Sequence, residues 1–454
     1  MTSAPTHHNY HDAYANDRAH VFHSWSAQSL INPTMIARAE GSTMWDFDGN
    51  RFLDFSAQLM NMNIGHQHPK MVSAIQEAAG RLSSIAPFHG NSDRSEAARL
   101  IAELAPSAMG NAMVFFTNGG AEGNENAIRM ARLHTGKHKV LSAHRSYHGA
   151  THGAIAMTGD PRRWPSEPAI PGVVRYFGPY PYRSSFHAET PEQECERALG
   201  HLEELIMFEG AHTIAAIILE SVVGTNGILV PPDGYLAGVR ELCDRYGIVM
   251  IADEVMAGFG RCGEWFAIDH WDVSPDLIVF AKGVNSGYVP IGGVLISETI
   301  ADSFRERPYP GGLTYSGHPL ACASIVASIN IFRDEHVLEH ARHLGADVIG
   351  PALADLAERH ESIGEVRGLG VFWAIELVRD RASREMLVPY NATGVDAAPM
   401  LEFQAACRAR GLWVFTHFNR VHVVPPCVIS DEQCHEGLSI IDEALSLTDA
   451  LVAG

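Results

Sequence analysis

The sequence predicts an α/β protein that has a mostly parallel central sheet in a large domain plus a small α+β domain. Apolar runs without alternation, at 214–219, 248–252 and 277–281, are separated by helical segments, which is typical of parallel strands covered on both faces. After residue 335 the pattern changes to short strands paired with helices. The chain has 454 residues, of which 46% are hydrophobic and 19% charged, so it can bury a sizeable core.

The N-terminal 60 residues predict a mobile arm followed by a hairpin. Residues 1–20 are polar and show no periodicity, and chain termini often fray. Residues 43–47 and 51–55 both alternate around Asp48-Gly49-Asn50, and Asp-Gly between alternating runs is a strong hairpin signal. We assign 1–60 to the small domain as its arm and hairpin, 61–335 to the large domain, and 336–454 to the C-terminal part of the small domain.

The remaining elements follow from hydrophobic periodicity and from capping residues. Gly247 marks the end of a helix over 235–246, and Ser430 with Gln433 forms a capping box at the start of the last helix. The stretch 160–189, rich in Pro, Arg and aromatic residues, is expected to be a long ordered loop. Further helices are expected at 121–134, 319–332, 337–359 and 400–410, and further strands at 139–142, 371–378, 412–416 and 420–424.

Charge and cysteine usage restrict the class of partner. The formal net charge of −20 argues against nucleic acid or an anionic membrane as the main partner, because both bind a basic face. No apolar run reaches the roughly 18 residues of a membrane span, and Met1–Asp17 lacks the apolar core of a signal peptide. The seven cysteines are scattered without a CxxC pair. We therefore expect reduced thiols in a cytoplasmic protein.

Three groups of residues could carry chemistry. The run 115–125 passes from an apolar strand through Gly119-Gly120 into a helix, and the amides of such a turn can bind phosphate. Asp253 and Lys282 each directly follow a buried strand, at the sheet edge where α/β folds bind ligands. Taken singly, the same residues could be an ordinary turn, a helix cap or salt bridge, and a surface lysine.

Together the three groups meet the needs of one cofactor. Pyridoxal phosphate requires a lysine for its aldehyde, an acid for its pyridinium nitrogen and a site for its phosphate. Lys282, Asp253 and the Gly119-Gly120 turn supply one of each. The sequence therefore predicts a pyridoxal-phosphate enzyme.

The chain resembles the class III (omega-type) pyridoxal-phosphate-dependent aminotransferases of fold type I, from about Ala39 to Ala444. The resemblance implies a ping-pong transfer of an amino group to a keto acid. It also implies a homodimer with active sites at the subunit interface. The motifs that carry it, in chain order, are FFTNGGAEGNENAIRMAR, SYHGAT, IILESVVGTNG, ADEVMAGFGRCGEWFA, FAKG, GGLTYSGHPLACA, EVRGLGVFWAIEL and VHVVPPCVIS.

The resemblance also implies roles for individual residues. Lys282 would carry the Schiff base and act as the catalytic acid and base, and Asp253 would pair with the pyridine nitrogen. Val255 and Tyr147 would pack on the two faces of the ring. Thr314 would reach the phosphate of the neighbouring subunit. The other residues expected at the cofactor are Gly120 and Ala121 at the phosphate, Glu220 near the ring hydroxyl, and His148 of the SYHGAT motif.

Departures from the family pattern concern the substrate. Gly119 replaces a frequent serine, Thr225 a glutamate of the 4-aminobutyrate and ornithine branch, and Phe415 a mobile arginine of many omega-aminotransferases. The candidate substrate pocket is apolar and aromatic, which favours a primary amine or omega-amino compound as donor and pyruvate as acceptor. Its residues would be Trp25, Met60, Phe88, Tyr147 and Phe415, with Arg162, Arg163, Arg367 and Arg420 as open candidates for the keto-acid carboxylate.

Several alternatives stay open. The donor could be taurine or β-alanine, and the same scaffold could support an aminomutase, epimerase or decarboxylase. A non-catalytic binding protein is disfavoured because Lys282 and Asp253 are both present. Histidines at 66–68 and 144–148 lack zinc-ligand spacing, so no metal is expected.

Overall fold

A 7-stranded sheet forms the centre of the computed structural model, which describes residues 10–452. The pairs that involve β10 are antiparallel and the others are parallel, so the predicted mostly parallel sheet is confirmed. In spatial order the strands are β4 (Met113–Thr117), β10 (Gly292–Ile296), β9 (Leu277–Phe280), β8 (Val249–Asp253), β7 (Ile214–Glu220), β5 (Lys139–Ala143) and β6 (Val173–Tyr176).

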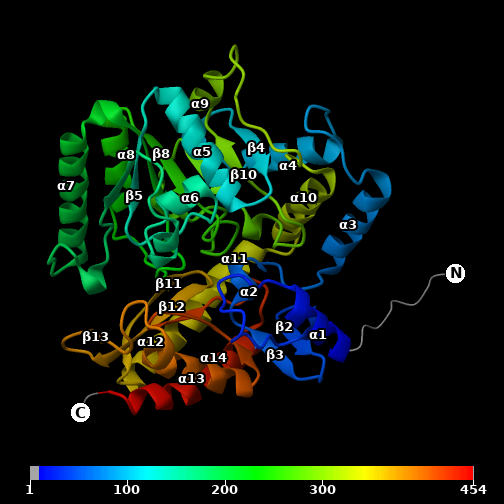
Figure 1. The fold of residues 1–454 in the computed structure, drawn as a ribbon, viewed down its shortest axis with the longest axis vertical. Coiled ribbons are helices and arrows are strands. Elements are labelled where there is room, and N and C mark those ends of the chain that lie inside the picture. The colour runs from blue at the N-terminus through cyan, green and yellow to red at the C-terminus, as the bar shows by residue number, and fades with distance from the viewer. Residues whose placement is uncertain (1–9, 453–454) are drawn as a thin grey trace.

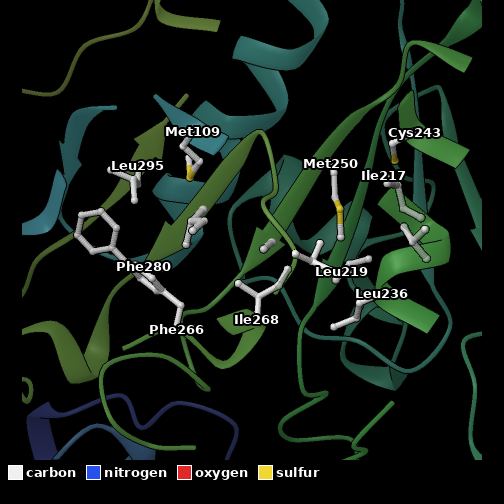
Figure 2. Packing of buried hydrophobic residues seen from close by; sticks show 14 of the residues in the cluster. Met109, Ile217, Leu219, Leu236, Cys243, Met250, Phe266, Ile268, Phe280 and Leu295 are labelled. Carbon is white, nitrogen blue, oxygen red and sulfur yellow. The ribbon is translucent and has the colours of Figure 1, made fainter. Parts of the chain in front are cut away.

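Helices cover both faces of this sheet. All residues of β7 are buried, and alternate residues serve two cores: Ile217 and Leu219 belong to one, Ala216 and Ile218 to the other. Figure 2 shows part of the first core, where Met250 and Leu236 lie near these strand residues. The first core includes residues of α4 (Ser92–Ala102), α7 (Pro191–Glu209), α8 (Tyr235–Tyr246) and α10 (Pro319–Asp334), and the second of α5 (Gly120–Thr135), α6 (His152–Met157) and α9 (Glu298–Asp302).

The N-terminal hairpin and the C-terminal segments pack together in a second region, below the large sheet in Figure 1. The hairpin strand β3 (Arg51–Asp54) pairs in parallel with β14 (Leu412–Trp413), and Leu53 and Phe55 share a buried cluster with C-terminal residues. The other elements here are β1 (Ile36–Glu40), β2 (Thr43–Asp46), β11 (Ile363–Leu369), β12 (Phe372–Asp380), β13 (Glu385–Met386), β15 (Phe415–His417), β16 (Arg420–Val423), α12 (Gly350–Arg359), α13 (Ala398–Ala409) and α14 (Asp431–Asp449).

Capping signals located helix ends well. Helix α8 covers the expected residues 235–246 and ends at Gly247, whose φ of 61° suits glycine. Helix α14 begins after Ser430, and the reciprocal capping box with Gln433 is present. The helices α2 (Ala57–Met60) and α3 (Pro69–Arg81) connect the hairpin to the large sheet.

Four expectations about secondary structure were wrong. The expected strand 412–416 is divided into β14 and β15, which belong to different sheets. Part of the expected N-terminal arm is the helix α1 (Tyr10–His20), with Asp12 in its first turn and Arg18 in its last, which suits the helix dipole; residues 1–9 lie outside the described part. The expected loop 160–189 contains the edge strand β6. The expected helix 337–359 is divided into α11 (Val337–His343) and α12 by a π-helical turn at Leu344–Ile349. Pro351 follows that turn and has no N–H to donate to it.

Within residues 10–452, no helix is both long and apolar enough to cross a membrane. The same part of the chain holds no group of three or more His, Cys, Asp or Glu residues placed to bind a metal ion. The cysteines are free thiols, and six of them are buried, while Cys195 is half-buried.

Candidate active site

A cavity of about 460 Å³ opens at the carboxyl ends of β7, β8 and β9. The β4–α5 turn, the loop after β5 and the turn at 59–61 complete its wall. Eight predicted cofactor residues line it together: Gly120, Ala121, Tyr147, His148, Glu220, Asp253, Val255 and Lys282. Their convergence follows from the parallel sheet, because strands that run in one direction end at one edge.

Lys282 is two residues beyond β9, at the start of the 3-10 turn Lys282–Val284. Its φ of 47° is a left-handed conformation that costs energy in a residue with a side chain and that clusters at functional sites. Burial lowers the pKa of its amine to about 8, although the nearby Asp253 and Glu220 carboxylates oppose this shift. A lysine amine with such a pKa is partly neutral near pH 7 and can act as a nucleophile.

Asp253 is the last residue of β8, and its side chain is buried with both carboxylate oxygens hydrogen bonded. Its Oδ2 accepts hydrogen bonds from Asn124 Nδ2 at 2.8 Å and from His148 Nδ1 at 2.7 Å. Its Oδ1 accepts from the backbone N–H of Val255 at 3.1 Å. These donors fix the orientation of the carboxylate toward the cavity that it lines. They leave His148 Nε2 buried without a hydrogen-bond partner among residues 10–452.

Glu220 ends β7 directly beside Asp253 in the strand register. It accepts hydrogen bonds from the backbone N–H groups of Tyr147 at 3.0 Å and Gly224 at 2.8 Å. Burial raises its pKa to about 7, and Asp253 adds to this rise. Glu220 can therefore hold or release a proton close to neutral pH.

The β4–α5 turn forms a cradle for an anion. The first N–H groups of α5 have no partner within the helix, and together with the helix dipole they favour phosphate. Gly120 is required for close packing, because a Cβ at this position would lie 2.7 Å from Val255 Cγ2. Thr117 Oγ1 donates to the carbonyl of Gly119 at 2.9 Å and holds the turn.

Comparison with known proteins adds the family. Residues 25–445 match the class-III aminotransferases. The chain belongs to this family. A putrescine–pyruvate aminotransferase of Pseudomonas aeruginosa is 33% identical over 92% of this chain and 91% of its own length.

Solved structures of similar aminotransferases share the whole fold. A taurine:2-oxoglutarate aminotransferase from Bifidobacterium kashiwanohense superposes with a TM-score of 0.94 at 38% identity, and the match covers 100% of both chains. An (S)-enantioselective omega-transaminase from Thermomicrobium roseum gives a TM-score of 0.89 at 36% identity and covers 96% of this chain and 98% of its own. The class III aminotransferase is thus a fold type I enzyme, as the sequence predicted.

As a class III aminotransferase, the enzyme uses pyridoxal phosphate, and the cavity fits this cofactor. Lys282 provides an amine, Asp253 an acid, and the β4–α5 turn an anion cradle, all around one space. The buried unpaired His148 Nε2 marks a polar position that the protein itself leaves open. When bound, the cofactor supplies the electron sink for bonds broken at the substrate carbon.

Of the five predicted substrate residues, Tyr147 lines the class III aminotransferase cavity and the other four do not. Trp25 and Phe88 are exposed, by 69% and 84%. Met60 is buried in a cluster against which Phe415 packs, and Leu59 lines the cavity in its place. Thr314 is exposed and belongs to no wall of the cavity.

Two residues at this cavity of the aminotransferase were not predicted from the sequence. Asn124 hydrogen bonds to Asp253, and Asn61 also lines the cavity. Asn124 could have been predicted from its spacing, because it lies four residues after Gly120 on the same helix and therefore on the same helical face. No sequence pattern places Asn61 at the cavity, because it follows a turn with unusual backbone angles.

Proposed function

We propose that this aminotransferase moves an amino group from a primary amine or omega-amino compound to a keto acid, pyruvate, in two half-reactions of a ping-pong cycle. The observation that carries the proposal is Lys282 with its lowered pKa beside Asp253 at the cavity. The cavity lining also contains Leu59, Val289 and Ile291. This apolar surface suits the hydrophobic body of an amine.

Each polar group then has a task in the reaction. Lys282 Nζ would move a proton from the substrate carbon to the cofactor in the first half-reaction and in the opposite direction in the second. Asp253 would stabilise positive charge on the cofactor ring, and Asn124 and His148 hold this carboxylate in place. The amides at the start of α5 would bind the phosphate, and Tyr147 and Val255 would pack against the ring.

The relatives support this donor class and one alternative. Putrescine–pyruvate aminotransferase pairs an amine donor with pyruvate, whereas the taurine aminotransferase accepts an omega-amino sulfonate. Taurine is therefore the second candidate donor.

We also propose a homodimer with shared active sites. Trp25, Phe88 and Thr314 are exposed in the single chain, although the sequence predicts roles for all three at the site. Phe22, Leu30 and Tyr315 add large exposed apolar side chains, which is typical of an interface. Sedimentation at micromolar concentration should give twice the chain mass of 49.5 kDa; a monomer with full activity would contradict the proposal.

A donor panel with pyruvate tests the function. The purified holoenzyme is incubated with putrescine, 1-phenylethylamine, β-alanine or taurine, and alanine formation is measured. We expect alanine from the amines. Alanine from taurine alone would favour the second candidate, and conversion of donors without any alanine would favour an aminomutase or decarboxylase.

A further inference from the structure

All four candidate arginines pair with acids of the protein. Arg367 contacts both Glu365 and Glu376, and its side chain is 10% exposed. Arg420 contacts Glu376 and is 4% exposed. Arg163 Nη1 donates to Glu167 at 2.8 Å. None of the four arginine side chains is part of the cavity wall, and Arg163, Arg367 and Arg420 would have to give up an ion pair to bind a small keto acid there.

Arg162 is not part of the cavity wall either, but it contacts a residue that is. Its guanidinium carbon lies 3.6 Å from the ring centroid of Tyr147, and Tyr147 is a wall of the cavity. Asp160, a fully buried carboxylate, holds Arg162 through Nε and Nη2. Nη1 has no hydrogen-bond partner in the described part of the chain, and the side chain keeps 24% of its exposure. One face of the guanidinium is thus anchored and one N–H group is free.

The charge of Arg162 also reaches the reacting group. It is one of the two arginines that lower the pKa of Lys282, and it likewise lowers the pKa of His417 on β15. Asp160 is the acid that pairs with Arg162, and Arg420 also lowers the pKa of His417.

We propose that Arg162 binds the carboxylate of the keto-acid acceptor, with Asp160 and Tyr147 fixing its position. Arg162 would replace the arginine that is absent at Phe415. A guanidinium that is stacked and anchored in advance loses little entropy on binding a carboxylate. Asn226 Nδ2 also donates to Asp160 Oδ2, at 3.2 Å, and helps to hold this carboxylate.

The inference rests on the proposed aminotransfer, and one experiment separates the two. The enzyme is loaded with an amino group, freed of donor and mixed with pyruvate or with butanal, which is neutral; the return of the cofactor absorbance gives the rate. Arg162→Gln should lower kcat/KM for pyruvate about 10- to 100-fold, the range for a charged hydrogen bond. The rate with butanal should change less than about twofold.

Matched variants complete the test. Arg163→Gln removes the neighbouring arginine and should match the wild type with both acceptors. Arg162→Lys keeps the charge without the planar fork and should recover part of the rate with pyruvate. If Arg162→Gln folds poorly because Asp160 is left buried without a partner, the double variant Arg162→Gln/Asp160→Asn removes that acid. It should show the same loss with pyruvate and not with butanal.

The outcomes are distinct. Equal loss with pyruvate and butanal would mean a structural role and would overturn the inference, as would an unchanged Arg162→Gln enzyme. A selective loss in Arg145→Gln would assign the carboxylate to that guanidinium, which stacks on Tyr180. A wild-type enzyme that transfers to neither acceptor would overturn the proposed function, and the role of Arg162 with it.

Discussion

The reactivity of Lys282 should follow its lowered pKa. In the cofactor-free protein, only the neutral amine attacks the aldehyde of pyridoxal phosphate. Burial places the pKa of this amine at about 8, below the usual 10.5. The rate of covalent reloading, followed by absorbance, should therefore rise with pH and level off above about pH 8. A rate that keeps rising to pH 10 would contradict this prediction, and Lys282→Ala is the control that forms no covalent complex.

Asp253 offers a second test at the residue scale. Asp253→Asn keeps the size of the side chain and an acceptor oxygen, so cofactor binding should survive. An amide does not stabilise a protonated ring nitrogen, and kcat for alanine formation should fall by about 100-fold or more, the scale of a lost charge interaction in a dry site. A wild-type kcat with normal cofactor content would mean that another acid faces the ring.

At the element scale, α2 shapes the cavity wall through an unusual backbone. Ala57, Gln58 and Met60 have positive φ angles, which are rare for residues with side chains. Asp54 holds this turn: it accepts from the Ser56 N–H at 3.1 Å, from Gln58 Nε2 at 2.8 Å and from His66 Nε2 at 3.0 Å. The turn presents Leu59 to the cavity.

Asp54→Asn should loosen this turn. Asparagine has one acceptor oxygen in place of two, and the lost bonds should cost about 1–3 kcal/mol of unfolding free energy. The KM for the amine donor should rise while kcat stays within about threefold, because Leu59 moves and Lys282 does not. Unfolding by urea and steady-state kinetics check this. An increase in KM for pyruvate alone would contradict it.

The same carboxylate predicts a pH dependence of stability. Burial would raise the pKa of Asp54, but hydrogen bonds from His66, Gln58 and Ser56 outweigh burial and lower it below 3.8. The folded-state pKa lies below the unfolded-state pKa. Ionised Asp54 therefore contributes its full stabilisation of the fold above the unfolded-state pKa, and this stabilisation is lost as the pH falls through the folded-state pKa. The Asp54→Asn variant and the wild type should therefore differ most at neutral pH and converge in acid.

Elements differ in how well the sequence predicts them. The hairpin and α8 follow from alternation and from glycine at the stop, both local signals. The turn at 57–60 does not, because its positive φ angles are imposed by Asp54 and by distant packing. A shift of one residue in such a turn exchanges a wall residue for a buried one, which is why Leu59 occupies the place expected for Met60.

At the scale of the molecule, the order of motifs along the chain predicts which residues meet at the carboxyl edge of the sheet. It does not predict the contacts between segments that lie far apart in the sequence. Strand ends in a parallel sheet converge by geometry, so Asp253 and Lys282 could be paired from their spacing. The pairing of β3 with β14 spans more than 350 residues and leaves no local pattern. The same is true of Arg261, whose contacts join three parts of the chain.

Arg261 is the largest fully buried side chain, and it should be essential to the assembled structure. Its Nη2 donates to Asn63 Oδ1 at 2.6 Å, after the N-terminal hairpin, and its Nη1 to the carbonyls of Val371 and Pro425. Arg261→Met would fill similar volume but leave three buried acceptors unpaired. We expect the free energy of unfolding to fall by about 3 kcal/mol or more, since unpaired buried acceptors cost about 1–3 kcal/mol each.

Thermal and urea unfolding measure the loss in Arg261→Met, with Arg359→Met as the control. Arg359 pairs with Asp355 and Asp442 on the surface, and exposed pairs contribute little, so this variant should unfold with the wild type. The Arg261 variant should also lose cofactor at a lower temperature than the wild type, because Phe259 and Gly260 connect this joint to the loop after Asp253. If both variants unfold alike, the joint is held by the apolar clusters and Arg261 is dispensable.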